Sequence, residues 1–473
     1  MTLTSTMFYL IFVIAVVLGL MLLIAWFSPR SPGFRRVTGG IYLLLTLGLV
    51  VYPLFTTVWF LTTDAGLRGA RSSTFAFSLH RSLSAKLPDY IDRRIESKIA
   101  TTLDRTQITA TESPVYGAFF YLQATECLQQ QWLRDPSLCN QAPAVTGARA
   151  IDASLRIMLD PNHAHWVRDY WGDDYLTEPN CFYRMLLIGC LTAHHNLTGE
   201  TAHLPLLRTV VADLVSDIDS SPVGLIDDYP SQCFPCDVAC CVAMIERAAR
   251  ALGEDRSDWA RQAFLRMMRL YPDGLPPYTA DAATGVALSP SRGCTNGFFF
   301  TYSPFLAPEL SRKWYQPFVR EFWQESALAA GWREFSKEGN SPPFSFDPDS
   351  GPVFAGFGTA ATGLGLGCTR AHGDHRRAGM LGAEMLAAAV PLPGGTLLVP
   401  RLVSDLDHAP YFAEISILHQ LSLAPAEPVT STATRVPLPP CAWYILSIEA
   451  TVLALLLFIC SRLLQPPGPR RQA

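Results

Sequence analysis

Charge is scarce in this sequence. Only 16% of its 473 residues are Asp, Glu, Lys or Arg, whereas a soluble globular chain carries about a quarter. The 37 basic and 41 acidic residues leave a formal net charge of −4, which excludes a strongly basic nucleic-acid-binding surface and a polyacidic tail. We therefore expect part of the chain to lie outside water, and we expect no nucleic-acid partner.

Several motifs of catalysis and cofactor binding are missing as well. The sequence contains no P-loop, nucleophile elbow or metalloprotease helix. Residues 363–367 read Gly-Leu-Gly-Leu-Gly, but no strand pattern precedes them and no acidic residue follows at the distance that a nucleotide site needs, so close helix packing explains them better. The 12 cysteines show no regular spacing typical of a disulfide scaffold. We predict neither a cofactor nor a metal.

Three long apolar runs account for the low charge: residues 7–27, 37–63 and 442–460. Each is long enough to cross a bilayer as a helix, and a transmembrane helix tolerates the glycines and the proline of the second run. No positive charge precedes the first run and no small-residue cleavage site follows it, so we do not interpret it as a signal peptide. We predict two N-terminal transmembrane helices and one C-terminal one.

Arginines flank these runs on one side of the predicted membrane. Three lie between the first two runs and three follow the last one: Arg30, Arg35, Arg36, Arg462, Arg470 and Arg471. Positively charged loops stay in the cytoplasm, so with three spans the long segment between the anchors lies on the periplasmic or extracellular side. Arg68 and Arg71, at the other end of the second run, do not follow this rule.

Two kinds of predicted helix alternate between the membrane segments. Nearly all-apolar helices begin at intervals of roughly 60 residues, near Val115, Cys181, Asp237, Gly297, Ala355 and Tyr411. More polar, amphipathic helices lie between them, at residues 201–219, 255–270, 309–330 and 375–389, and residues 89–102 supply another. Apolar helices ringed by amphipathic ones form an all-α fold, the α/α toroid or (α/α)6 barrel.

The domain assignment follows from this pattern. Residues 111–430 form the predicted barrel, residues 1–63 and 431–473 the membrane anchors, and residues 64–110 a connecting helical segment. The loops that lead into the inner helices, at residues 171–180, 224–237, 289–296 and 346–352, carry acids, cysteines and aromatic residues. Because equivalent loops of a toroid open at the same end, we expect these side chains to meet at one cavity mouth.

Each motif in these loops has a simpler alternative. Cys233-Phe-Pro-Cys236 can be a metal fragment, a redox dithiol, a pair of buried cysteines or part of an acid–base site. The fragments His163-Ala-His165 and His372-Gly-Asp-His375 do not match a usual metal-binding motif, and we interpret these histidines as solvated loop residues. The pairs Asp173-Asp174 and Asp227-Asp228 are turn formers or catalytic carboxylates.

Five pieces of the chain carry a family resemblance: residues 170–173, residues 180–199, residues 224–237, Trp314-Tyr-Gln-Pro-Phe318 and the glycine-rich helix from Gly356. In this order they resemble the linalool dehydratase/isomerase family, and the similarity runs from about Tyr116 to Val390. The resemblance implies an α/α barrel that acts on terpenoid alcohols.

The resemblance also implies site residues. The family's active-site loop has two cysteines nine residues apart; the second falls on Cys236 and the first on Asp227. The family's histidine position falls on Leu186, and one tyrosine position falls near Cys294. The substrate-binding wall then consists of Tyr183, Leu186, Cys294, Phe298, Phe299, Phe300 and Tyr302.

These substitutions still form an acid–base set. Dehydration needs one group that protonates the leaving hydroxyl and another that takes a proton from the neighbouring carbon, in an apolar pocket. A half-buried Asp227 with a raised pKa can be the acid, Cys236 can be a base if a neighbour lowers its pKa, and Asp228 is a further catalytic candidate. We expect a membrane-anchored lyase or isomerase for a hydrophobic alcohol or alkene.

Two other classes remain open. One is a non-catalytic toroid that binds a lipid or a partner protein, since the family's histidine is absent. The other is a toroid of the glycosidase or polysaccharide-lyase type, which needs carboxylates across an open groove with exposed tryptophans, whereas a pocket of phenylalanines with one or two acids favours terpenoid-like substrates.

Overall fold

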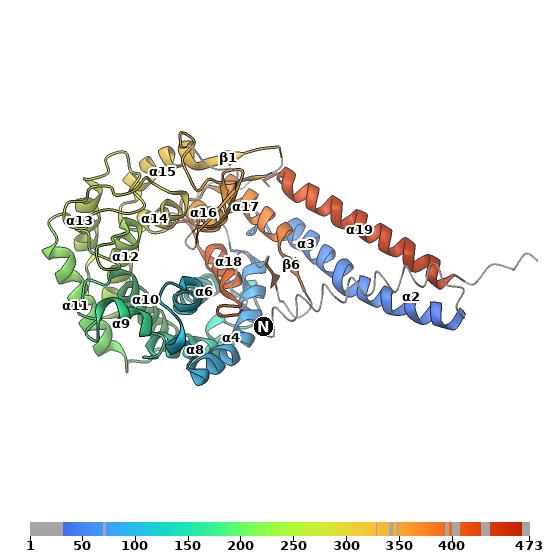
Figure 1. Cartoon of the computed structure of the whole chain (residues 1–473), viewed down its shortest axis with the longest axis horizontal. Helices are drawn as coiled ribbons and strands as arrows, with labels where there is room; N and C mark the ends of the chain where they lie inside the picture. Colours follow the sequence, from blue (N-terminus) through green and yellow to red (C-terminus); the bar gives the residue numbers. More distant parts are fainter. Residues whose placement is uncertain are drawn as a thin grey trace, which may run out of the picture.

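The computed structural model describes residues 32–69, 72–327, 329–339, 344–347, 350–392, 397–399, 407–426 and 436–465. The described chain is mostly helical with a few short strands, as the sequence predicts. A rounded body of helices carries α2, α3 and α19 on one side, and these three helices extend away from it (Figure 1). The predicted membrane span at residues 7–27 lies outside the described residues.

Six helices of the described chain follow one another around the inside of the body. They are α6 (Ser113–Arg134), α10 (Cys181–Thr198), α12 (Pro235–Ala251), α14 (Gly293–Leu306), α16 (Thr359–Ala371) and α18 (Phe412–Ser422). Each packs against the next in this order, and α18 packs against α6. They begin within a few residues of the six predicted starts, because helices that are apolar or small on every side can only be buried.

Six more polar helices cover these: α4 (Thr74–Ser97), α8 (Ala148–Leu159), α11 (Leu204–Ser220), α13 (Ser257–Met268), α15 (Pro308–Phe322) and α17 (His375–Ala388). The helices α11, α13, α15 and α17 each pack on the inner helix that precedes them in the chain. The helix α8 packs on α6 and α10, and α4 packs on α8 and α18. Their apolar stripes face inward; in α13, for example, Ala263, Phe264 and Met267 are buried. The segment predicted as a connection thus contributes a covering helix, α4.

Two helix boundaries differ from the prediction. The helix predicted at residues 89–102 begins at Thr74. The helix predicted at 309–330 ends at Phe322, where the chain turns into β1 (Trp323–Glu325), which pairs antiparallel with β2 (Ala330–Trp332). This hairpin stacks Trp332 on Phe318 at a ring separation of 4.2 Å and buries it completely, a contact that the helical pattern did not reveal.

The remaining elements are short. They are the helices α5 (Ile108–Thr111), α7 (Pro143–Thr146) and α9 (His165–Trp171), and the 3₁₀ turns η2 (Ile99–Thr102) and η3 (Pro136–Leu138). The strands β3 (Phe344–Asp347), β4 (Gly351–Phe354) and β5 (Phe357–Gly358) form one antiparallel sheet, and β6 (Val390–Pro391) pairs with β7 (Leu397–Leu398).

Among the described residues, two helical stretches are long and apolar enough to cross a membrane. One is Arg36–Thr63, which comprises α2 (Pro32–Thr46), the π-helical turn η1 (Leu47–Val51) and α3 (Tyr52–Thr63); the other is α19 (Pro440–Leu464). Their 28 and 25 residues exceed the roughly 20 that a bilayer core requires. They coincide with the predicted spans 37–63 and 442–460. The end of α19 packs against the start of α2, where Leu463 approaches Gly39, so the two stretches are antiparallel (Figure 1).

Candidate functional site

Tyr116 of α6 lies in an aromatic cluster on the inside of the ring of helices. Its ring centroid is 4.3 Å from that of Phe120, 5.5 Å from Phe182 of α10, 6.2 Å from Phe298 of α14 and 5.9 Å from Phe412 of α18. Four of the inner helices therefore contribute rings to one cluster. The sequence analysis did not select Tyr116 as a site residue, although a tyrosine in the first turn of a helix predicted to be apolar was an available signal.

Acidic and thiol side chains of α12 and α14 act electrostatically on Tyr116. Burial, and after it the neighbouring Asp237, Cys240, Cys236 and Cys294, raise the pKa of Tyr116 well above its usual value. The hydroxyl therefore stays protonated and can donate a hydrogen bond. Asp237 lies in the first turn of α12, where the helix dipole stabilises its negative charge.

Cys236 is a buried neutral thiol. Its Sγ donates to Asp237 Oδ1 at 3.6 Å. Burial, Asp237, Asp228 and Cys294, in this order, raise the pKa of Cys236 well above its usual value. The condition under which Cys236 could act as a base, a neighbour that lowers its pKa, is therefore not met, because the neighbours that act on Cys236 are acids and a thiol. Cys236 can orient Asp237, but it cannot serve as a ready base at neutral pH.

Asp228 is the buried carboxyl group of the site. Its side chain is 1% exposed; Oδ2 accepts a hydrogen bond from the backbone N–H of Phe234 at 2.7 Å, and Oδ1 has no hydrogen-bond partner among the described residues. Burial, and after it Asp237, raise the pKa of Asp228 well above its usual value. Asp228 therefore holds a proton under conditions in which an ordinary aspartate has lost it.

Asp227 precedes Asp228 in the same loop but is less buried. Its Oδ2 accepts a hydrogen bond from the backbone N–H of Ser231 at 3.2 Å, and it is only half-buried. Burial raises the pKa of Asp227, with Asp281 as the neighbouring acid. The predicted direction of the shift is thus correct for Asp227, but Asp228 rather than Asp227 is the neighbour that contributes to the raised pKa of Cys236.

The loops that lead into the inner helices do meet. Residues 227–236 fold back on themselves, because Tyr229 bridges to Gln232 and Ser231 adopts a left-handed conformation at φ 62°. The indole of Trp171 donates to the carbonyl of Asp228 at 3.4 Å, the N–H of Cys181 donates to the carbonyl of Asp227 at 3.0 Å, and Cys233 bridges to Ala280. These contacts connect the loops that precede α10, α12 and α14, which are three of the four loops expected to converge.

Cys294 is fixed by a buried acid. Its thiol donates to Glu334 Oε1 at 3.0 Å, and Arg292 Nε donates to the same oxygen at 2.7 Å. Glu334 is fully buried. Gly293 makes this approach possible, since a Cβ at this position would lie 1.8 Å from the backbone oxygen of Arg333. The sequence analysis did not identify Glu334, which lies after a hairpin that it did not predict.

Some predicted wall residues face the inside of the ring and others do not. Phe298 contacts both Tyr116 and Tyr302, and the Tyr302 hydroxyl lies beside the thiol of Cys240. By contrast, Tyr183 donates its hydroxyl hydrogen to the carbonyl of Met158 in the covering helix α8 at 2.9 Å.

Two further predicted wall residues are buried on other faces. Phe299 stacks on Phe264 of the covering helix α13 at 5.6 Å, so it packs between the two layers of helices, and Phe300 stacks on Phe318 of α15 at 5.0 Å. Leu186 is fully buried. It lies on the same face of α10 as Phe182, which precedes it by one helical turn.

A polar network joins α6 and α12 farther along these helices. Arg247 of α12 forms an ion pair of 2.6 Å with Glu126 of α6 and also donates to Gln123. The second oxygen of Glu126 accepts from Asn196 of α10 at 2.9 Å. Because α10 lies between α6 and α12 in the ring, this network links three inner helices below the aromatic cluster.

The remaining motifs have structural roles. Cys233 and Cys236 are free thiols, as are all 12 cysteines, and within the described ranges no three His, Cys, Asp or Glu side chains are grouped to hold a metal ion. His163 is not solvated as expected; it is buried, because its ring binds Asp160 at 2.7 Å and Arg94 at 2.9 Å. His372, also expected in solvent, binds Ser311 at 3.0 Å.

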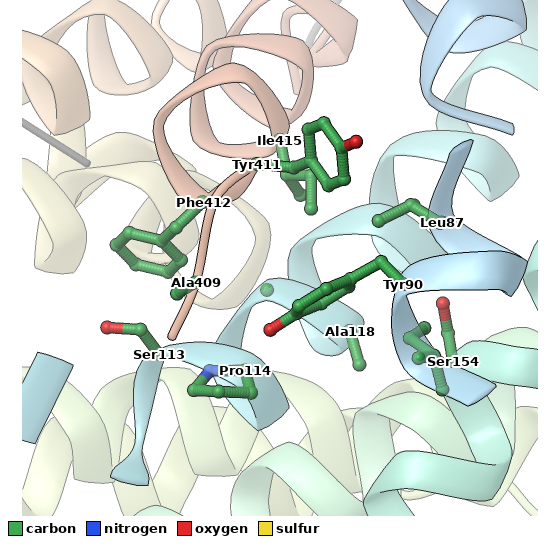
Figure 2. A pocket seen from close by; sticks show the side chains of 12 residues that line it. Leu87, Tyr90, Ser113, Pro114, Ala118, Ser154, Ala409, Tyr411, Phe412 and Ile415 are labelled. Atoms are coloured by element: carbon green, nitrogen blue, oxygen red, sulfur yellow. The ribbon is translucent and has the colours of Figure 1, made fainter. Parts of the chain in front are cut away.

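A small apolar cavity lies beside the aromatic cluster, with which it shares Phe412, between α4, α6, α8 and α18 (Figure 2). Tyr90, Pro114, Tyr411 and Phe412 are among its lining residues. Its volume of about 20 Å³ is enough for about one water molecule and far too small for a terpenoid alcohol. This cavity is therefore not the predicted substrate pocket.

No family model matches this sequence, and a search of curated proteins finds no match either. The candidate site is consequently defined by its own geometry: the buried carboxyl group of Asp228, the carboxyl group of Asp237 in the first turn of α12, buried thiols, and a set of aromatic rings.

Proposed function

We propose that this protein is a membrane-anchored enzyme that dehydrates, hydrates or isomerises a hydrophobic alcohol or alkene by acid–base catalysis. We further propose that its twelve inner and covering helices form an (α/α)6 toroid similar to that of the linalool dehydratase/isomerase family. The closed order of contacts among the six inner helices of the described chain supports the toroid.

The observation that carries the proposal is that Phe234 holds both acids close to each other. Its N–H donates to Asp228 Oδ2 at 2.7 Å, and its carbonyl accepts from the N–H of Asp237 at 2.9 Å. In dehydration, protonated Asp228 gives its proton to the hydroxyl oxygen of the substrate, the C–O bond breaks and water leaves. Asp237 then takes a proton from the neighbouring carbon, and the electron pair of that C–H bond forms the alkene. Hydration runs through the same steps in reverse.

The rings around Tyr116 suit a substrate that develops positive charge. The faces of Tyr116, Phe120 and Phe298 stabilise a cationic carbon through their quadrupoles, and their bulk excludes water that would otherwise trap it. The Tyr116 hydroxyl, which remains protonated, can donate a hydrogen bond to the substrate oxygen. In this arrangement carboxyl groups replace the family's histidine and first cysteine, and Cys236 orients Asp237.

We propose that residues 36–63 and 440–464 span a membrane, together with the apolar run at residues 7–27 as a third span. Trp59, Trp443 and Tyr444, all more than half exposed, lie near the helical body, as interfacial aromatic residues do. Arg36 and Arg462 lie at the opposite end of the antiparallel pair. By the positive-inside rule this favours a barrel on the non-cytoplasmic side.

Two alternatives make different predictions. A non-catalytic toroid that binds a lipid or a partner fits the neutral thiols and the leucine at position 186. A sugar-processing toroid fits less well, because Asp173 and Asp174 are exposed in a turn and phenylalanine and tyrosine rather than exposed tryptophan surround Tyr116.

The direct test is turnover. Protein purified in detergent is incubated with a panel of terpenoid and prenyl alcohols and the matching alkenes, and products are analysed by gas chromatography and mass spectrometry. We expect an alkene from at least one alcohol. A lipid or terpenoid that co-purifies without any turnover would instead favour the non-catalytic toroid, and cleavage of a polysaccharide would favour the sugar-processing one.

A further inference from the structure

Three phenylalanines form an exposed apolar face on the β3–β4 hairpin. Phe344 and Phe346 alternate along β3 and therefore lie on the same face, and Phe354 of β4 pairs directly with Phe344, with ring centroids 5.2 Å apart. Their exposed fractions are 58%, 59% and 49%. Val353, on the other face of β4, is fully buried. The hairpin thus packs on the protein with one face and presents aromatic rings with the other.

A run of paired strands connects this hairpin to the apolar helices. β4 pairs with β5, and Phe357 of β5 bridges to Arg333, which directly follows β2. The N–H of Ala330 in β2 donates to Glu384 of α17 at 2.9 Å, and α17 packs against both α3 and α19. The hairpin therefore lies on the side of the ring that carries the apolar helices, where Figure 1 places α16 and α17.

The hairpin also lies beside the candidate site. β5 leads directly into the inner helix α16, which begins at Thr359. Arg333, the bridge partner of Phe357, precedes Glu334, the acid that holds Cys294. The exposed phenylalanines are thus connected to the end of the helical body at which the loops before α10, α12 and α14 meet.

We propose that the face formed by Phe344, Phe346 and Phe354 contacts the lipid surface of the membrane that holds the anchors. The anchors keep the ring next to a bilayer, and the strand pairing ties the face to the anchor side, about three strand spacings or 14 Å from β2. Aromatic side chains partition readily into the headgroup region. The contact would bring the end of the ring with the candidate site close to a source of apolar substrate.

This inference rests on the proposed membrane anchoring but not on the proposed chemistry. Its test uses the full-length protein in nanodiscs of phosphatidylcholine and phosphatidylglycerol, with p-benzoylphenylalanine introduced by codon suppression in place of Phe346. Two matched variants carry p-benzoylphenylalanine elsewhere. One has it in place of Trp443, which lies within α19, and the other has it in place of Leu288. Leu288 is 61% exposed and lies in the loop between α13 and α14. In Figure 1, α13 lies on the side of the helical body away from the apolar helices.

After irradiation, lipid adducts are identified by mass spectrometry. We expect lipid adducts at positions 346 and 443 and none at 288. An adduct at 443 but not at 346 would overturn the inference and leave the anchoring intact, as would crosslinking of position 346 to a second copy of the chain. Absence of adducts at both 346 and 443 would overturn the anchoring and the inference together. Adducts at all three positions would show that contact is not confined to the hairpin and would also overturn the inference.

Discussion

Replacing Asp228 with Asn should stabilise the protein at neutral pH. The carboxyl is 1% exposed, and burial followed by Asp237 raises its pKa well above the usual value. In the unfolded chain the same group ionises near its ordinary pKa of about 3.9. Above that pH, unfolding is therefore favoured by release of a proton, and the folded state loses stability until the pH reaches the pKa of the folded protein.

The size of the effect follows from the linkage relation. Each pH unit between the unfolded and folded pKa values of Asp228 costs about 1.4 kcal/mol of folding free energy. Asn resembles the protonated carboxyl, since its oxygen can still accept from the N–H of Phe234, but it does not titrate. Asp228→Asn should therefore match the wild type near pH 4 and exceed it increasingly as the pH rises towards 7.

Thermal unfolding in detergent between pH 4 and pH 7 measures this difference. The control is Asp227→Asn, since Asp227 is only half-buried and its carboxylate accepts from Ser231; this variant should show a smaller dependence on pH. The reasoning is refuted if Asp228→Asn is less stable than the wild type at pH 7, or if the difference between them does not change with pH.

Three further predictions concern the site and the core. Cys236→Ala removes the thiol that donates to Asp237, so it should reduce turnover while the protein stays folded. The control is Cys190→Ala, which removes another buried thiol, one remote from the aromatic cluster, and should leave turnover unchanged. Equal turnover by the two variants would exclude a role for Cys236. Arg247→Met should lower the free energy of unfolding by about 3 kcal/mol, because it removes the ion-pair partner of the buried carboxylate of Glu126. Adding Glu126→Gln to this variant should restore most of the lost stability. A double-mutant cycle that shows no coupling between the two positions would contradict this prediction. Gly293→Ala should unfold at a markedly lower temperature, since its Cβ would lie 1.8 Å from a backbone oxygen; an unchanged melting temperature would show that this close approach is not required.

Much of the helical architecture can be predicted from the periodicity of apolar residues in the sequence. The all-apolar helices had to be buried and the amphipathic ones had to cover them, so starts such as that of α10 at Cys181 follow from composition alone. The strands do not, because β1 and β2 are three residues long and are held by tertiary contacts such as the packing of Trp332 on Phe318. Short strands stabilised by one tertiary contact leave no periodic signal.

The candidate site could be predicted only in part from the sequence, for a related reason. Sequence spacing pointed to the loop that holds Asp227, Asp228 and Cys236, but which of two adjacent acids is buried depends on a turn closed by Ser231. The pKa of Cys236 depends on groups that approach from α14 and from its own helix. Tyr116, which joins these groups, became recognisable only when four helices placed rings around it.

The central claim is that Asp228 donates the proton in a dehydration. The measurement that tests it most directly is the rate of alkene formation by the wild type, Asp228→Asn and Asp227→Asn, each shown to be folded, with the best alcohol of the panel. A positioned general acid contributes about 10²–10⁴-fold, so we predict a loss of that size for Asp228→Asn alone, despite its greater stability. An Asp228→Asn protein that turns over the alcohol at the wild-type rate would contradict the account.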